Sequence, residues 1–588
     1  MRKLYKGGCL MMAALTAFGF ASCGGRIMNE DELNDGRVPI LINVDMGGNG
    51  SAWIEEMAKD WNATSTTHRI VVDCTTKVTY DMVGADSLTP NGKYSAWFTP
   101  QLTNIDKLAS AGQVEDLTDV INRTLPGENR TIWDKVKNKE LWDKVGSKID
   151  GTGQYMLPYA SSFIGMVFDY EFFMERGYLT YANASELSDI NANSVVAVAD
   201  GQKVKCTVKF GNYEVGEYVM SKGKDGKYGT YDDGQPTTEA EFNELLSEIS
   251  LHDRTFLYSG QNNYPNAMAH AIMAQYVGMD AYETYLTFDS HGQKVKLFDV
   301  DTKQVTEKEI TLDNGYDVYK MEGLYKTIEL TQEWLMDTDK VHPYTQKNEQ
   351  PMVIQKDWLN GYRNISGNPQ AAFLVEGCWW ENEAMGYLNE LGARDASRGF
   401  GAREYRYMLL PAFEGQATPA DRSMFHLQDT GSFVVTQHPK DAAGQAKLAA
   451  VKDFIAYTLS DENLRRYTRM TGIVRPYDYE MTAEDLAQMT PFARNVQEIF
   501  ADTEHIEITN GTMIQSLTPL RMVRVNGSQG VTGGDFPSKI GNISRQWIYS
   551  ALRFASVPDV FRSMNNYYDP ALWAQFVAAA RNTGLYDA

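Results

Sequence analysis

Residues 38–74 read VPILINVDMGGNGSAWIEEMAKDWNATSTTHRIVVDC. The first nine form a largely apolar run, as expected for a strand buried on both faces. After GGNG, Ser51 can cap a helix. The apolar residues that follow recur at helical spacing: Trp53, Ile54, Met57, Ala58 and Trp61. HRIVVDC then returns as a strand. A strand, a helix and a second strand form one βαβ unit, so the sequence predicts an α/β protein that opens with a parallel sheet.

The glycine loop after the first strand matches neither the GxxxxGK[ST] nor the GxGxxG phosphate-binding pattern. We therefore interpret its glycines as letting a ligand approach the backbone at the carboxyl end of the strand.

The chain begins with three basic residues and a short apolar stretch, Cys9–Phe20, that ends in small residues before Cys23. This stretch is too short for a membrane span and predicts a secretory signal over residues 1–22. FASC resembles a lipobox, which predicts a lipid-modified Cys23, a tether over residues 23–36, and anchoring to the outer face of a bacterial membrane. The alternative is an ordinary signal peptide cut at a nearby small residue.

The charge balance excludes some partners. The formal net charge is -22, and without the three basic residues of the signal 52 of 55 basic residues remain against 77 acidic ones, which gives -25. An acidic surface argues against nucleic acid and anionic lipid as partners. The 33 Tyr and 11 Trp exceed what a core requires and suit a polar ligand with flat faces. The cysteines at 74, 206 and 378 lack metal-like spacing, and we expect no disulfide.

Later segments give local signals. Thr238 and Glu241 form a capping box before a helix that places Phe242, Leu245, Leu246 and Ile249 on one face. Ser460 caps, and Gly472 ends, a helix that follows another over about 441–459. The last hundred residues have a mainly helical pattern.

Two charged, turn-rich segments, 190–236 and 284–326, look like insertions. In the second, the DNG at 313–315 predicts the turn of a hairpin.

Taken in order, several motifs resemble those of the extracellular solute-binding proteins of ABC importers that handle sugars. They are LASAGQVEDLTD, GQYMLPYASSFIGMVFDYEFFMERGY, AAFLVEGCWW, YRYMLLPAF, GSFVVTQ and TGIVRP, between Arg37 and Tyr477. The chain departs from the family in its length, in both insertions and in its helical tail.

The resemblance implies the type II periplasmic-binding-protein fold, with two α/β lobes joined by several chain crossings around a ligand cleft. It implies one lobe of about 37–160 plus 410–475 and another of about 161–409 plus 476–588. It also implies a monomer without a cofactor, a sugar or oligosaccharide ligand, and ABC permease subunits as partners. A non-sugar solute such as a peptide is an alternative.

The tryptophan of the family's G.W motif lies in the cleft, and it matches Trp379. Sugars present apolar faces to aromatic rings, so Trp379 is the first candidate contact. Trp380 points into the core unless the chain turns sharply after Gly377. The alternative is that both rings pack beneath the following helix.

The resemblance also implies polar ligand contacts after the first strand and at Ser162, and other polar residues are further candidates. Asp45 and Asn49 follow the first strand, where Asp45 could equally cap the next helix. Thr103 and Asn104 begin a later helix and could also be caps. The remaining candidates, near the lobe crossings, are Tyr159, Ser161, Ser162, Asp429 and Thr430.

KDGKYGTYDDGQP contains Asp225, Asp232 and Asp233, which could hold Ca²⁺. The stretch does not match the EF-hand pattern, and a solvated turn is the favoured interpretation.

A secreted glycoside hydrolase is the main rival, because it too would be acidic and rich in aromatic residues. It needs two carboxylates placed across the scissile bond. Glu376, Glu381 and Glu383 could be offered, but nothing in the sequence gives a reason for a perturbed pKa. There is no GxSxG or HExxH, and the eight histidines show no metal spacing. A surface scaffold would leave the two-lobe signature unexplained. The sequence predicts a binding protein and no enzyme.

Overall fold

The computed structural model describes residues 35–44, 47–74, 92–99, 105–148, 150–183, 197–198, 202–203, 218–227, 230–260, 264–347, 349–361, 370–506, 555–565 and 570–582. The chain forms two compact units. Unit 1 is Met1–Ser161 with Thr430–Gln488, and unit 2 is Ser162–Asp429 with Met489–Ala588. Two strands, β4 (Leu157–Asp169) and β14 (Met424–Val435), therefore begin in one unit and end in the other.

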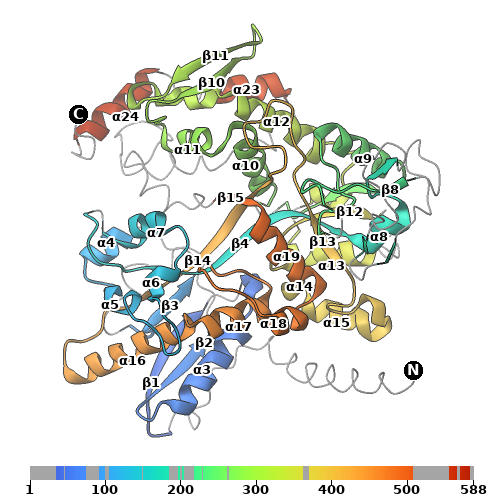
Figure 1. The fold of residues 1–588 in the computed structure, drawn as a ribbon. Helices are drawn as coiled ribbons and strands as arrows, with labels where there is room; N and C mark the ends of the chain where they lie inside the picture. Colours follow the sequence, from blue (N-terminus) through green and yellow to red (C-terminus); the bar gives the residue numbers. More distant parts are fainter. Residues whose placement is uncertain are drawn as a thin grey trace, which may run out of the picture. The chain divides into compact units, whose positions relative to one another are not determined.

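The predicted α/β class is confirmed (Figure 1). The chain crosses between the units at 161/162, 429/430 and 488/489. The sequence predicted these crossings near 160, 410 and 475. Residues 405–408 belong to unit 2 because they pair there, as strand β13, with the second half of β4.

The sheet of unit 1 contains the predicted βαβ unit. β1 (Val38–Val44) pairs in parallel with β2 (His68–Asp73) and with β3 (Ala96–Thr99). The second half of β14 pairs with β3 in antiparallel fashion, with Val434 opposite Trp97. A strand from late in the chain thus completes the sheet begun by the first residues.

Helix α3 (Ala52–Thr64) buries the predicted residues, from Trp53 to Trp61. Ser51 does not cap this helix through its side chain. Its hydroxyl instead donates to Glu55 Oε1 at 2.6 Å, because the Ser51 backbone is already close to helical, at φ -112° and ψ -13°. The indole of Trp53 stacks on Tyr159, with centroids 5.8 Å apart, and meets Tyr467 edge-on at 4.8 Å.

Helices α16 (Ala442–Thr458) and α17 (Asp461–Thr471) pack against α3 (Figure 1). The predicted caps are confirmed: the Ser460 hydroxyl accepts from Asn463 N, and Gly472 ends α17 at φ +73°. The remaining described helices of unit 1 are α4 (Ile105–Ser110), α5 (Thr118–Ile121), α6 (Ile132–Lys135), α7 (Lys139–Gly146) and α18 (Ala483–Gln488).

Arg475 lies fully buried beneath the start of β4. Its Nε donates to the Tyr159 carbonyl at 2.8 Å and its Nη1 to the Thr458 carbonyl at 2.6 Å. The guanidinium lies over the rings of Tyr467 and Tyr477, at 5.3 and 5.6 Å. Carbonyl oxygens and ring faces therefore surround this cation.

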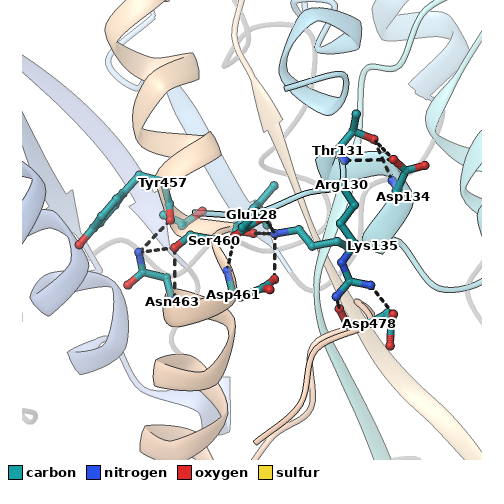
Figure 2. A network of polar contacts seen from close by, with 12 residues as sticks. Glu128, Arg130, Thr131, Asp134, Lys135, Tyr457, Ser460, Asp461, Asn463 and Asp478 are labelled. Atoms are coloured by element: carbon teal, nitrogen blue, oxygen red, sulfur yellow. Dashed lines mark hydrogen bonds and ion pairs between the residues drawn. The ribbon is translucent and has the colours of Figure 1, made fainter. Parts of the chain in front are cut away.

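A second buried cation ties together distant parts of unit 1 (Figure 2). Lys135 has no exposed surface, and its Nζ donates to Glu128 Oε2 at 2.6 Å, Leu459 O at 2.7 Å and Asp461 Oδ1 at 3.1 Å. Glu128 Oε1 accepts from Asp461 N at 2.7 Å. The network joins the loop before α6 to the start of α17.

In unit 2 the strands pair around the second half of β4. β12 (Ala371–Gly377) pairs in antiparallel fashion with the second half of β4 and in parallel with β9 (Arg254–Leu257). β13 (Tyr405–Met408) also pairs with β4, and β15 (Glu504–Ile506) pairs with the first half of β14. Phe373 in β12 contacts Phe168, Phe242 and Phe256, at the centre of the core.

The helices of unit 2 include α9 (Glu239–His252), whose predicted capping box and buried face are confirmed. The others near the core are α8 (Tyr170–Arg176), α10 (Tyr264–Val277), α13 (Pro351–Gly361), α14 (Trp380–Glu383), α15 (Met385–Arg394) and α19 (Pro491–Asp502). No helix in the described part of the chain is both long and apolar enough for a membrane span.

The segment 284–326 contains an antiparallel hairpin, β10 (Lys294–Asp299) with β11 (Gln304–Glu309). The prediction that DNG forms the hairpin turn is wrong. Asn314 lies instead in the 3-10 helix η2 (Leu312–Lys320), where its side chain accepts from Thr311 N at 2.7 Å. The turn forms earlier, because Asp299 Oδ1 accepts from the backbone N–H groups of residues 301 and 302.

The C-terminal helices α23 (Val557–Asn565) and α24 (Pro570–Asn582) pack on this segment and on α12 (Glu322–Leu335) (Figure 1). The buried indole of Trp573 donates to Leu312 O at 2.7 Å and lies against Gly315. Arg562 contacts Asp301 through Nε and Nη2 at 3.0 and 2.8 Å. We call this assembly of 284–326 with α23 and α24 the accessory layer.

The Lys135 network generates a stability prediction. We expect Lys135→Met to lower the free energy of unfolding by about 3 kcal/mol, because it removes the buried ammonium that bonds to both Glu128 and Asp461. Urea unfolding followed by circular dichroism measures this change. Lys139→Met is the matched control, since Lys139 lies 3.8 Å from Asp134 with both side chains exposed, and it should leave the midpoint unchanged. Equal effects of the two substitutions would contradict the assignment.

Candidate functional site

Several predicted contacts lie outside the described residues or outside the described side chains. Three of them, Asp45, Thr103 and Asn104, lie outside the described residues. Cys23 and Cys206 also lie outside the described residues. Asp429 and Thr430 lie within β14, but their side chains are not described. Asn49 ends the short helix η1 (Gly47–Asn49) and is half-buried.

Tyr159 and Ser161 lie on the part of β4 that belongs to unit 1, and both are buried. The ring of Tyr159 fills the space beside Gly431, where an added Cβ would come within 2.6 Å of it. Ser161 N–H donates to Val474 O at 2.8 Å. Tyr159 thus packs in the core between Trp53 and Gly431.

The segments that carry Ser162 and Trp379 are joined by a backbone hydrogen bond. Cys378 N–H donates to Phe163 O at 2.9 Å, so the turn after β12 lies directly beside the strand that carries Ser162. Ser162 is 2% exposed and Trp379 is 6% exposed.

The indole of Trp379 folds back over Gly377. Three atoms of its six-membered ring lie 2.3–2.4 Å from the position that a Cβ on Gly377 would occupy, so no larger residue fits there without a shift. The ring of Tyr264, the first residue of α10, meets Trp379 edge-on with centroids 6.0 Å apart. No sequence pattern singled out Tyr264, which begins an ordinary Ala-rich helix.

Trp380 has no exposed surface. Its ring packs against Trp358, Tyr405 and Phe492, with centroid distances of 5.0 to 5.6 Å. The chain turns after Gly377 so that the two adjacent rings point to different surroundings. This placement corresponds to the packing interpretation of Trp380.

Of the three carboxyl groups near the tryptophans, those of Glu376 and Glu381 are buried and that of Glu383 is half-buried. Glu376 is 1% exposed, and burial followed by the neighbouring Glu383 raises its pKa to about 8. Glu381 is 4% exposed, and burial raises its pKa to about 7 while its Oε2 accepts from the Thr490 hydroxyl at 2.5 Å. A general acid or base must reach its substrate, and these two carboxyls face the interior of unit 2.

The loop that contains Asp225, Asp232 and Asp233 is held by hydrogen bonds between its own residues. Asp232 Oδ2 accepts from the N–H groups of Lys224 and Asp225 at 2.6 and 3.0 Å, and Oδ1 accepts from the Thr230 hydroxyl at 2.9 Å. No group of three or more acidic, histidine or cysteine side chains in the described ranges is arranged to hold a metal ion. Asp232 and Asp233 are buried, so the prediction of a solvated turn is wrong.

Nothing in the sequence pattern predicted that the lysine of this loop, Lys224, is buried. The Lys224 ammonium donates to Leu410 O at 3.0 Å and to the Ser423 hydroxyl at 2.9 Å, and burial lowers its pKa to about 8.

No protein-family model matches the chain, and no curated protein matches its sequence. Solved structures do match. The SBP RafE in complex with raffinose is 12% identical, with a TM-score of 0.51 over 91% of this chain and all of that one. A chitin oligosaccharide binding protein is 12% identical, with a TM-score of 0.50 over 93% of this chain and all of that one.

The chain has the fold of solute-binding proteins. A third match comes from work on xylan utilisation by the thermophilic bacterium caldanaerobius polysaccharolyticus, with 12% identity and a TM-score of 0.50 over 90% of this chain and all of that one. The predicted resemblance is confirmed at the level of the fold.

The contact between Gly377 and Trp379 generates a second prediction. Gly377→Ala should lower the free energy of unfolding by about 2 kcal/mol, because its methyl group displaces the Trp379 ring. Gly386→Ala in α15 is the control: it has open space around the added Cβ, and Ala favours a helix. Thermal unfolding should separate the two variants, with a lower midpoint for the first and an equal or higher midpoint for the second. If Gly377→Ala is as stable as the native chain, the ring does not lie there.

Proposed function

We propose that this protein captures a sugar or oligosaccharide outside the cytoplasm and delivers it to the permease of an ABC importer. The observation that carries the proposal is the fold, which extends over about nine-tenths of the chain and over the whole of RafE and of the chitin oligosaccharide binding protein. The order of the sequence motifs from Arg37 to Tyr477 supports the same assignment.

In this proposal the two units close around the solute, and the closed form docks on the permease. A ligand stabilises the closed form only through its higher affinity for that form. Partner subunits hydrolyse ATP, so the protein itself needs no cofactor. The resemblance also implies that it acts as a monomer.

The residues proposed to hold the solute come from both units. In unit 2, Trp379 offers an aromatic face to the apolar side of a sugar ring, with Tyr264 at its edge and the Ser162 segment alongside. In unit 1, the loop with Asp45 and Asn49 follows the carboxyl end of β1, where parallel sheets commonly bind ligands. Thr103, Asn104, Asp429 and Thr430 complete the proposed set.

A thermal-shift screen of the purified protein against mono- and oligosaccharides tests the proposal. A sugar present at 100 times its dissociation constant should add about 2.7 kcal/mol of stability. Trp379→Ala should abolish the shift, because it removes the aromatic face.

Trp573→Ala is the matched control, since it removes a buried tryptophan of the accessory layer. It should lower the melting temperature and retain the sugar-induced shift. If no sugar shifts the protein and a peptide does, the solute class is wrong. If a sugar is consumed, the hydrolase hypothesis returns.

We further propose that the mature protein is anchored through a lipid on Cys23, after removal of residues 1–22. The native chain, expressed in a bacterium, should partition into the detergent phase of Triton X-114, because the acyl chains add a large apolar surface. Cys23→Ser should move it to the aqueous phase. A native chain found in the aqueous phase would indicate an ordinary signal peptide.

A further inference from the structure

Unit 2 contains a small polar cavity between α9, β9 and α12, away from the turn that carries Trp379. Its volume is about 40 Å³, and its lining includes Asn243, Ser247, Thr255, Glu333, Trp334 and Lys340. A cavity of this size accepts about three groups as large as a water molecule. The groups that line it decide what such a ligand must be.

Thr255 is the most buried polar residue of the lining, at 1% exposed. Its N–H donates to Lys340 O at 2.9 Å. Its hydroxyl oxygen is buried and has no hydrogen-bond partner among the described residues. Because a buried hydroxyl without a partner is destabilising, such a group in a native protein usually meets a water or a ligand. A molecule in the cavity would supply that partner.

Two further side chains bring donors to the cavity. Asn243 Oδ1 accepts from Trp334 Nε1 at 2.8 Å, so the amide has its N–H groups to offer to a ligand. The Lys340 ammonium lies 3.3 Å from Asp337 Oδ2, and the two side chains are 42% and 35% exposed. An exposed pair of this kind contributes little, so the ammonium can turn to a ligand at small cost. These donors suit a carboxylate, whose three heavy atoms match the volume.

The exposed carboxylate of Glu333 lies at the rim of the cavity. Glu239 and Glu329 act on it as like charges. Lys326 is close to both of these residues, at 2.8 and 3.4 Å, and is therefore already shared between them. The rim thus carries an excess of negative charge, which attracts an ammonium and repels a simple anion.

We propose that this cavity binds a free α-amino acid. The carboxylate of the amino acid accepts from the Thr255 hydroxyl, the Asn243 amide and the Lys340 ammonium. Its ammonium group lies at the rim beside Glu333, and its side chain projects out of the cavity, which has no room for it. The inference goes beyond the proposed function, because none of these residues belongs to the proposed sugar set.

Glycine is the probe that tests the proposal. We would observe its methylene group by saturation-transfer difference NMR with the purified native protein. The dissociation constant should be on the order of 1 mM, which a ligand of five heavy atoms can reach. Acetate and methylamine each carry one of the two charges and should bind at least about tenfold more weakly. If glycine does not bind, or if acetate binds as tightly as glycine, the proposal is wrong.

Two substitutions of exposed side chains locate the glycine. Lys340→Met and Glu333→Gln should each weaken glycine binding about tenfold, because each removes one ionic contact. Glu333→Gln should not weaken the binding of acetate, which has no ammonium group. Lys144→Met is the matched control, since the exposed Lys144 pairs with Glu140 at 2.9 Å in unit 1 and should not affect glycine. Equal glycine binding by Lys340→Met and Lys144→Met overturns the assignment to this cavity.

The role of the buried hydroxyl is tested at position 255. Thr255→Val removes the hydroxyl and should weaken glycine binding, whereas Thr255→Ser keeps the hydroxyl and should retain it. Equal binding by the two variants contradicts the hydrogen bond to the carboxylate. No sugar is present in these measurements, so their failure leaves the proposed transport function standing, and failure of the sugar screen leaves this inference standing.

Discussion

The pairing of β3 with the second half of β14 is the constraint on which the rest of the structure depends. Val434 lies opposite Trp97, although the whole first segment of unit 2 separates them in the chain. Unit 1 therefore cannot complete its sheet from its N-terminal residues alone. At translation rates of about 5–20 residues per second, its first part waits on the order of tens of seconds for its partner strand. The two units are therefore interleaved in sequence, and unit 1 cannot complete its sheet before the second half of β14 is synthesised.

Three buried cations also connect segments that are far apart in the sequence, and each is held in a different way. Lys135 is held by two carboxylates and a carbonyl, which makes it sensitive to the loss of any partner. Arg475 is surrounded by carbonyl oxygens and tyrosine rings, an arrangement suited to a weakly hydrated, planar cation. Lys224 is placed by a tight acidic turn against carbonyls that follow β13. Each joins segments far apart in the sequence, so each stabilises the tertiary arrangement more than any single element.

Local features of the fold could be predicted from the sequence, because the residues that determine them are neighbours in the chain. The capping box at Thr238, the ends of α17 at Ser460 and Gly472, and the opening βαβ unit all belong to this class. The prediction of a hairpin turn at DNG was wrong because the Asn314 side chain instead accepts from the N–H of Thr311, the residue before η2. The different surroundings of Trp379 and Trp380 depend on Tyr264, Trp358 and Phe492, which come from three separate elements. The polar cavity between α9, β9 and α12 has no sequence signature for the same reason.

The contact of Trp573 with η2 has an evolutionary consequence. The segment 284–326, which the sequence predicts to be an insertion, and the C-terminal helices each cover apolar surface on the other. A deletion that removed the insertion alone would leave the rings of Phe561 and Trp573 without cover, and loss of the tail alone would uncover Phe288 and Phe298. We therefore expect the two segments to be inherited as one character: homologues should carry both or neither, and substitutions at Gly315 should accompany smaller side chains at position 573.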